Sequence, residues 1–120
     1  MRIIVCGSRT FNDYVLLRKT MDHLTSNLDE NKLVILSGHA KGADLLGEKW
    51  CFQRLLKYEV YRPEYKNDRD KIAPLLRNQT MVDNADAIVA FHNGESIGTA
   101  DILQRAEKKG LKIKVINYEE

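Results

Sequence analysis

Three short loops in the sequence combine glycine with hydroxyl, basic or acidic residues, and each loop follows an apolar run. The runs are 3–6, 33–36 and 88–91. Glycine lets a backbone approach a ligand closely, and the unpaired amides of a helix that begins after such a loop attract anions. The loops therefore predict a phosphate-type site, with candidate ligand-binding residues Gly7, Ser8, Arg9, Ser37, Gly38, Ala40, Gly42, Ala43, Asp44, Gly94, Ser96, Gly98 and Thr99.

Each loop also has a simpler interpretation. The segment 94–99 is typical of a phosphate cradle, but a tight strand-to-helix turn has the same composition. Arg9 has the planar fork that binds phosphate or carboxylate, and it is otherwise a solvated loop cation. Asp44 either orders its loop near a helix N-terminus or contacts the ligand. Three such loops in one short chain favour ligand binding.

Residues for acid–base chemistry are fewer. Arg77 and Asn78 precede the third loop. Asn78 is a further candidate ligand-binding residue, and Arg77 could bind phosphate or stabilise a leaving group. Asp101 and Glu95 could stabilise an oxocarbenium-like transition state, although both positions suit ordinary surface acids. His39 and His92 could act as proton shuttles, but neither has a catalytic partner residue at a fixed spacing in the sequence. No Cys-x-x-Cys or His-x-x-x-His pair occurs, so we expect no metal and no required cofactor.

Length and composition favour one globular domain over residues 1–120, with 43% hydrophobic and 30% charged residues. The net charge of +2 argues against nucleic acid as a partner. No apolar stretch is long enough to cross a membrane and no signal-peptide profile is present, so we expect a cytoplasmic protein. Cys6 and Cys51 are expected as buried free thiols.

The elements that must position the loops alternate along the chain. Apolar, β-branched runs predict strands, and apolar residues on one helical face predict helices. The expected strands are 2–6, 33–36, 59–62, 87–91 and 112–117. The expected helices are 13–28, 43–56, a third from 70 or 74 to about 82, and 99–109, with Gly110 as the residue after the last.

This alternation predicts an α/β, Rossmann-like, doubly wound three-layer sandwich with a mostly parallel five-stranded sheet in the order 3-2-1-4-5. The winding then reverses between the first and fourth strands. Open α/β sheets bind ligands outside the carboxyl ends of their strands at this point. The loops after strands 1, 2 and 4 should therefore converge on one crevice.

The motifs in these loops also resemble a known family. They are Gly7-Ser8-Arg9 with Phe11, then Ser37-Gly38-x-Ala40-x-Gly42-Ala43-Asp44, then Arg77-Asn78-x-x-Met81 with Ala85-Asp86 and Gly94…Gly98-Thr99. In order and spacing they look like the YspA-related branch of the SLOG superfamily. That superfamily includes DprA/Smf proteins, which bind single-stranded DNA, and LOG proteins, which are phosphoribohydrolases. The resemblance implies a Rossmann-like domain that binds nucleotide-derived ligands and forms dimers or larger assemblies.

The resemblance leaves three functions open. The first is a sensor or sequestering protein that binds a nucleotide or an NAD- or ADP-ribose-derived molecule. The second is a LOG-like phosphoribohydrolase with Arg77 and Asp101 as catalytic residues. The sequence departs from LOG proteins here, because Asn78 replaces a lysine, 93–96 replaces Pro-Gly-Gly, and Asp101 stands where paired glutamates are found. The third is DprA-like binding of single-stranded DNA, against which the modest charge argues.

Overall fold

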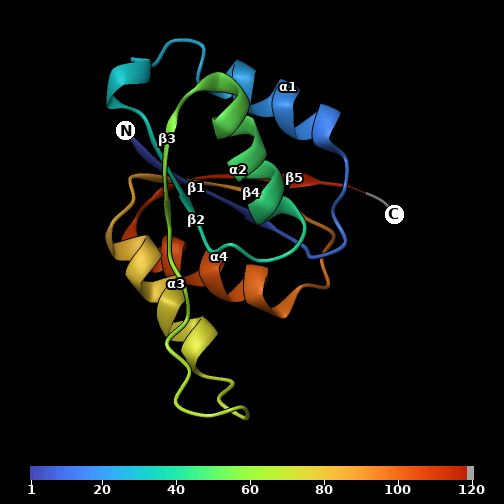
Figure 1. Ribbon diagram of the computed structural model, residues 1–120, viewed down its shortest axis with the longest axis vertical. Coiled ribbons are helices and arrows are strands. Elements are labelled where there is room, and N and C mark those ends of the chain that lie inside the picture. The colour runs from blue at the N-terminus through green and yellow to red at the C-terminus, as the bar shows by residue number, and fades with distance from the viewer. Residues whose placement is uncertain (119–120) are drawn as a thin grey trace.

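Five parallel strands form the centre of the computed structural model, which describes residues 1–118 (Figure 1). Their order across the sheet is β3-β2-β1-β4-β5, as predicted. The reversal of winding lies between β1 and β4, so the predicted switch point is confirmed. The strands are β1 (Arg2–Gly7), β2 (Val34–Ser37), β3 (Lys57–Val60), β4 (Ala87–His92) and β5 (Lys112–Asn117).

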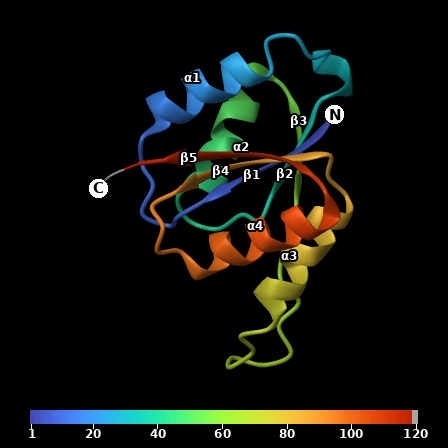
Figure 2. The same ribbon diagram turned by 180° about the vertical axis from the view of Figure 1, so that it is seen from behind.

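Helices cover both faces of the sheet, which gives three layers. Figures 1 and 2 show α1 and α2 on one face and α3 and α4 on the other. Within residues 1–118, no helix is long and apolar enough to cross a bilayer. The helices are α1 (Tyr14–Leu24), α2 (Ala43–Arg54), α3 (Ala73–Asp83) and α4 (Ile97–Lys109), with a short 3₁₀ helix, η1 (Glu30–Lys32), before β2.

The central strands are apolar without alternation because both of their faces are covered. In β1, Ile3 and Val5 pack into the core beneath α1 and α2, around Trp50. Ile4 and Cys6 point the other way, into the core beneath α3 and α4. Cys6 and Cys51 are buried free thiols, as predicted.

Helix boundaries differ from the predictions where capping decides them. Helix α1 ends at Leu24 rather than at 28, because the Thr25 hydroxyl donates to the carbonyl oxygen of Met21 at 2.6 Å and closes the last turn. Helix α4 begins at Ile97, two residues before the predicted start at 99. Ser96 caps it by accepting a hydrogen bond from the amide of Thr99. Helix α2 ends at Arg54, and α3 runs to Asp83.

Strand β3 also starts earlier than predicted, at Lys57 rather than at 59. It is an edge strand, and Lys57, Tyr58 and Glu59 are exposed. Its polar composition therefore lacks the apolar signal that marks a buried strand. The prediction for Gly110 is confirmed, because it ends α4 in the left-handed conformation with φ 82°.

The connection 61–72 extends beyond the sheet and leads into α3, forming the lowest part of Figure 1. The carboxylate of Asp70 orders its end by accepting from the amides of Lys66, Ile72 and Ala73. These hydrogen bonds lower the pKa of Asp70, since they stabilise its charged form. The connection thus fixes where the first turn of α3 stands beside the strand ends.

Candidate functional site

A cleft of about 480 Å³ opens where the carboxyl ends of β1, β2 and β4 meet the first turns of α3 and α4. It brings together residues from all three predicted loops and from the segment before β4. Among the predicted site residues, those that line it are Gly7, Ser8, Arg9, Gly38, Ala40, Asp44, Arg77, Asn78, Ser96, Gly98 and Thr99.

The loops after β1 and β4 are held together by Ser8. Its hydroxyl donates to Oδ1 of Asn93 at 3.0 Å, and the amide of Asn93 points back to the same hydroxyl at 3.3 Å. Oδ1 of Asn93 also accepts from the amide of Glu95 at 2.9 Å. Ser8 is only 2% exposed, so its main role is to build this wall of the cleft.

Close backbone packing explains two of the predicted glycines. A Cβ atom on Gly7 would lie 2.2 Å from the carbonyl oxygen of Phe91, and one on Gly42 would lie 2.3 Å from that of Ser8. The loops after β1, β2 and β4 can therefore meet only if these positions have no side chain. Gly42 does not line the cleft itself, and neither do Ala43 and Gly94.

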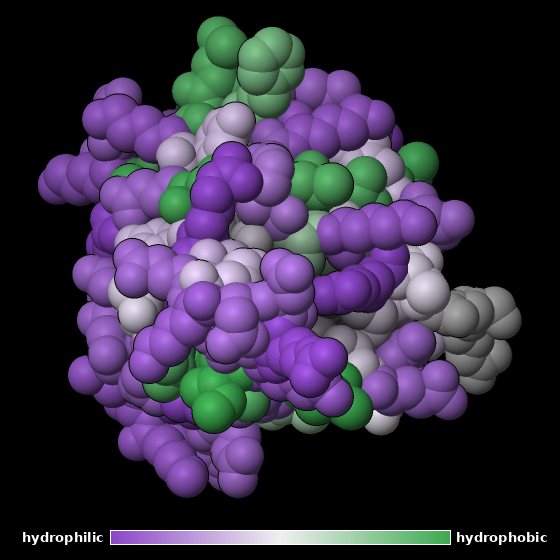
Figure 3. All heavy atoms as spheres, turned by 60° about the horizontal axis from the view of Figure 1, so that its bottom comes forward, coloured by the Kyte–Doolittle hydropathy of each residue, from purple (hydrophilic) through white to green (hydrophobic). Residues whose placement is uncertain are grey.

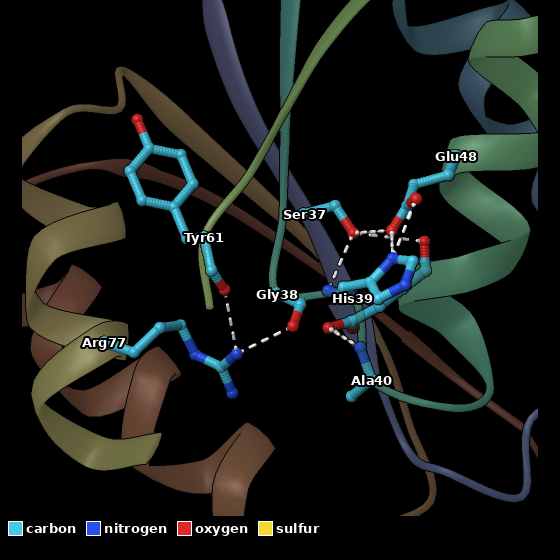
Figure 4. A network of polar contacts seen from close by, with 8 residues as sticks. Ser37, Gly38, His39, Ala40, Glu48, Tyr61 and Arg77 are labelled. Carbon is cyan, nitrogen blue, oxygen red and sulfur yellow. Dashed lines mark hydrogen bonds and ion pairs between the residues drawn. The ribbon is translucent and has the colours of Figure 1, made fainter. Parts of the chain in front are cut away.

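Arg77 joins α3 to the loop after β2, as Figure 4 shows. Its Nη1 atom donates to the carbonyl oxygen of Gly38 at 2.7 Å and to that of Tyr61 at 3.1 Å. Its Nε atom donates to Oδ1 of Asn78 at 3.2 Å. The guanidinium therefore lines the cleft with its orientation fixed by backbone acceptors that directly follow β2 and β3.

Asp44 lies on the floor of the cleft and is 6% exposed. Burial raises the pKa of its carboxyl to about 6, although the amides of Ala40 and Gly38 and the charge of Arg77 act in the opposite direction. The hydrogen bond from the Ala40 amide to Oδ2 is 3.2 Å long. Asp44 therefore orders its loop, as one of the two interpretations predicts, and it also borders the ligand space.

Ser37 does not line the cleft. Its hydroxyl donates to Oε2 of Glu48 at 2.7 Å, and the same carboxylate lies 2.8 Å from Nδ1 of His39 (Figure 4). This cluster lies behind the loop, against α2. Ser37 and His39 thus support the loop from outside, and His92 is likewise absent from the lining.

The first turn of α4 forms the wall opposite Asp44. Oγ of Ser96 accepts from the amide and the hydroxyl of Thr99, at 3.3 and 2.9 Å. Helix geometry leaves the next amides without intrahelical acceptors, and within residues 1–118 those of Ile97 and Gly98 have no hydrogen-bond partner. A Cβ on Gly98 would have no neighbour within 4 Å. Nothing in the described chain therefore requires glycine at this position.

Asp101 lies one turn further along α4, outside the lining of the cleft. Its Oδ2 atom accepts from Nδ2 of Asn78 at 3.0 Å and from Nε of Arg105 at 2.8 Å. Nδ2 of Asn78 also points to the carbonyl oxygen of Gly98 at 3.3 Å. Asp101 therefore holds α3 and α4 together, and its predicted catalytic role stays a prediction.

One wall of the cleft was missed from the sequence. It is apolar and consists of Pro74, Leu75, Met81, Ile97 and Ile102, with Cys6 at the floor. Burial raises the pKa of the Cys6 thiol well above its usual value, so the floor is uncharged there. The apolar spacing of α3 signals only a core-facing helix, and it does not tell which of its residues border a ligand space.

A model of the YspA, cpYpsA-related SLOG family matches residues 1–67. The Gene 61 protein of Mycobacterium phage D29 is 34% identical over 125 residues, which cover 98% of this chain and 95% of that protein. Two solved structures share the fold, each with a TM-score of 0.75. They are DNA processing protein A (DprA) from Streptococcus pneumoniae, at 19% identity, and from Helicobacter pylori, at 20%.

The match to these two structures covers 98% and 99% of this chain, but only 50% and 66% of theirs. Their likeness corrects one prediction. The modest net charge argues against nucleic acid as a partner, and that inference is wrong: the structure of the Helicobacter pylori protein is described by its single-stranded DNA binding mode. The two structures show that this chain has the same fold as part of each DprA protein.

Proposed function

This chain belongs to the YspA, cpYpsA-related SLOG family, and we propose that its cleft binds a nucleotide or an NAD- or ADP-ribose-derived molecule as a sensor or sequestering protein. The proposal needs three features in one cleft: donors for a phosphate, acceptors for a ribose and an apolar wall for a base. The cleft has candidates for each, and they come from different elements.

Gly98 carries the proposal. Glycine is less favourable than alanine in a helix, by up to about 1 kcal/mol in the interior, and it is usually explained by a positive φ or a close neighbour. Gly98 has neither. It lines the cleft beside the amides that lack acceptors, where a side chain would stand between those amides and a bound anion. We propose that the phosphate lies here, with Arg9 as its second partner.

Asp44 and the apolar wall support the rest of the ligand. Ribose hydroxyls are hydrogen-bond donors, and a carboxylate on the floor of a cleft accepts from them. Pro74, Leu75 and Ile97 offer a surface against which a base can pack. Arg77 stands between these regions, where its charge favours an anionic ligand.

Hydrolysis of an N-glycosidic bond has less support. The carboxylate of Asp101 is engaged by Asn78 and Arg105, and it lies outside the lining. Glu95 does line the cleft, but it is exposed at its rim. Glycosidases usually place two carboxyl groups beside the scissile bond. Within residues 1–118, the two that line this cleft are Asp44, which we assign to the ribose hydroxyls, and Glu95 at the rim.

Single-stranded nucleic acid is the second candidate, favoured by the fold shared with the two DprA proteins. The phosphate donors, the ribose acceptor and the apolar wall of the cleft suit one nucleotide unit of such a strand as well as a free nucleotide. The two ligands differ in salt dependence, because a strand places several phosphates on the protein and its affinity then falls steeply as salt rises.

The first experiment is mass spectrometry of small molecules released from the freshly purified, heat-denatured protein. Calorimetric titrations with AMP, NAD, ADP-ribose and a single-stranded oligonucleotide follow, each at two salt concentrations. We expect a stoichiometric nucleotide-type ligand, unchanged after incubation. Free base and ribose phosphate would instead establish hydrolysis. A purified protein that releases nothing and binds none of the four would overturn the proposal.

A further inference from the structure

Strand β3 leaves one edge of the sheet unpaired. The amide of Tyr61 donates to the carbonyl oxygen of Ser37 in β2, at 2.8 Å. Backbone groups alternate along a strand, so Lys57 and Glu59 also face β2, whereas the N–H and C=O groups of Tyr58 face away from the sheet. Such an edge is a template for another strand unless something blocks it.

Beside this edge, the C-terminal end of α2 presents two exposed apolar side chains. Phe52 is 75% exposed and Leu55 is 92% exposed, and Tyr58 of β3 is 41% exposed. Leu55 also has a φ of 56°, a left-handed conformation that is strained for leucine and easy for glycine. The left-handed conformation closes the C-terminal end of α2, since the amide of Leu56 donates to the carbonyl oxygen of Cys51 at 2.9 Å. The exposure of the leucine side chain has no such explanation within residues 1–118. We name Phe52, Leu55 and β3 the β3 edge surface.

Exposed apolar side chains also occur elsewhere in residues 1–118, such as Ile97 at 83% and Ile72 at 62%. On the face shown in Figure 3, most atoms are hydrophilic and the hydrophobic ones form small separate groups. Isolated exposed apolar residues are normal on any protein. Two exposed apolar side chains beside an unpaired strand, with Leu55 at 92% exposure, are a more specific combination.

We propose that a second copy of this chain pairs with the β3 edge surface, with the two β3 strands antiparallel about a two-fold axis at Tyr58. In this register Tyr58 faces the partner's Tyr58 and the outward backbone groups of the two residues bond each other. Lys57 then lies opposite the partner's Glu59, and Glu59 opposite the partner's Lys57. Opposite charges at facing positions stabilise such a pair, so the edge is complementary to itself.

The side chains already present allow this arrangement. Glu59 accepts from Arg2 and Tyr61 on the α3 side of the sheet. A carboxylate has capacity for further donors, so the partner's Lys57 can join. Lys57 itself forms no ion pair with any residue in the range 1–118. Phe52 and Leu55 then cover the other face of the paired β3 strands, on the α2 side, where the two Tyr58 rings meet.

The inference is independent of the proposed ligand. The cleft lies at the carboxyl ends of the strands. Antiparallel pairing places the two clefts at opposite ends of a continuous ten-stranded sheet, so neither cleft needs the partner's residues. Association and ligand binding should therefore respond to different substitutions.

Sedimentation velocity of the wild-type chain over a range of concentrations tests the dimer. We expect a monomer–dimer equilibrium, and a chain that stays monomeric throughout the micromolar range would overturn the proposal. Leu55→Gly is the sharpest variant, because glycine relieves the left-handed strain and removes the apolar contact. We expect it to melt at an equal or higher temperature while its dimer dissociation constant rises about tenfold or more. An unchanged dissociation constant would exclude this surface.

Reversing the charge at Lys57 or at Glu59 tests the proposed register of the two β3 strands. Lys57→Glu places like charges opposite each other in its own homodimer, and so does Glu59→Lys. We expect each variant alone to be largely monomeric, and a mixture of the two to form a heterodimer in which both charge pairs are restored. Circular dichroism checks that each variant is folded. Two variants that dimerise as well alone as mixed, or that fail to associate when mixed, would contradict the antiparallel register about Tyr58.

Discussion

The Nη1 atom of Arg77 lies 2.7 Å from the carbonyl oxygen of Gly38, and this hydrogen bond joins residues that are 39 positions apart. A Cβ atom on Gly38 would lie 2.8 Å from that same Nη1 atom and 2.8 Å from Oδ2 of Asp44. Gly38 therefore allows a cation and an acid to approach one backbone position from two sides. The shape of the cleft floor depends on this contact.

Gly38→Ala should displace Arg77 or the loop. We expect the free energy of unfolding to fall by about 1–3 kcal/mol, as for other overpacked sites, and ligand affinity to fall with it. Denaturant unfolding measures the first effect and calorimetry the second. In an Arg77→Ala background the same change should be less destabilising, since one of the crowded atoms is gone. Equal losses in both backgrounds would show that Arg77 is not the obstacle.

Gly98→Ala should separate stability from binding. Alanine is favoured over glycine by about 1 kcal/mol in a helix interior and by less at Gly98, the second residue of α4, so the variant should unfold at an equal or slightly higher denaturant concentration. The added methyl group enters the ligand space, and we expect the affinity for the nucleotide to fall at least about tenfold, which corresponds to about 1.4 kcal/mol. Ala100→Gly is the matched control, because Ala100 is exposed on the same helix outside the cleft lining. It should lose stability and keep binding.

Asp44 should make the fold less stable as pH rises. Its pKa is raised from 3.8 to about 6 in the folded chain, so between these values the folded state holds more protons than the unfolded state. The unfavourable contribution is absent below about pH 4, grows as the pH rises to about 6, and is complete above it. A shift of this size corresponds to about 3 kcal/mol.

The measurement is the difference in unfolding free energy between the wild type and Asp44→Asn at several pH values. We expect this difference to change by up to about 3 kcal/mol between pH 4 and pH 7, in favour of the variant as the pH rises. The test is how this difference in unfolding free energy changes with pH. The new amide alters hydrogen bonds and so shifts the difference by the same amount at every pH. A difference that does not vary with pH would show that Asp44 titrates normally.

Asp101 and Arg105 should behave as a structural pair. Their side chains are 20% and 28% exposed, and the ion pair spans one turn of α4. Asp101→Ala and Arg105→Ala should each lower stability by about 0.5–1 kcal/mol, and the double variant by less than the sum. A double-mutant cycle in denaturant measures this coupling. If Asp101 is catalytic instead, Asp101→Ala will abolish a hydrolytic activity that Arg105→Ala retains.

Local patterns in the sequence predict the order of the elements and the edge of the sheet at which the loops gather. Unbroken apolar runs mark 3–6, 33–36 and 88–91 as buried strands, and alternation with helices leaves one economical strand order. Parallel strands place their carboxyl ends on one side, so the convergence of the three loops followed from local patterns alone. Edge strand β3 was placed two residues late, because exposed polar residues carry no such pattern.

Which loop residues face the ligand space depends on long-range packing, which local patterns do not show. Ser37 is in the predicted loop, yet it turns to Glu48 on α2, and Asp101 turns to Asn78 and Arg105. The apolar wall from α3 and the contact between Arg77 and Gly38 also depend on this packing. Local spacing assigns a residue to a strand, helix or loop, but the direction of its side chain depends on partners distant in the chain. Those partners become neighbours only when the helices pack on the sheet.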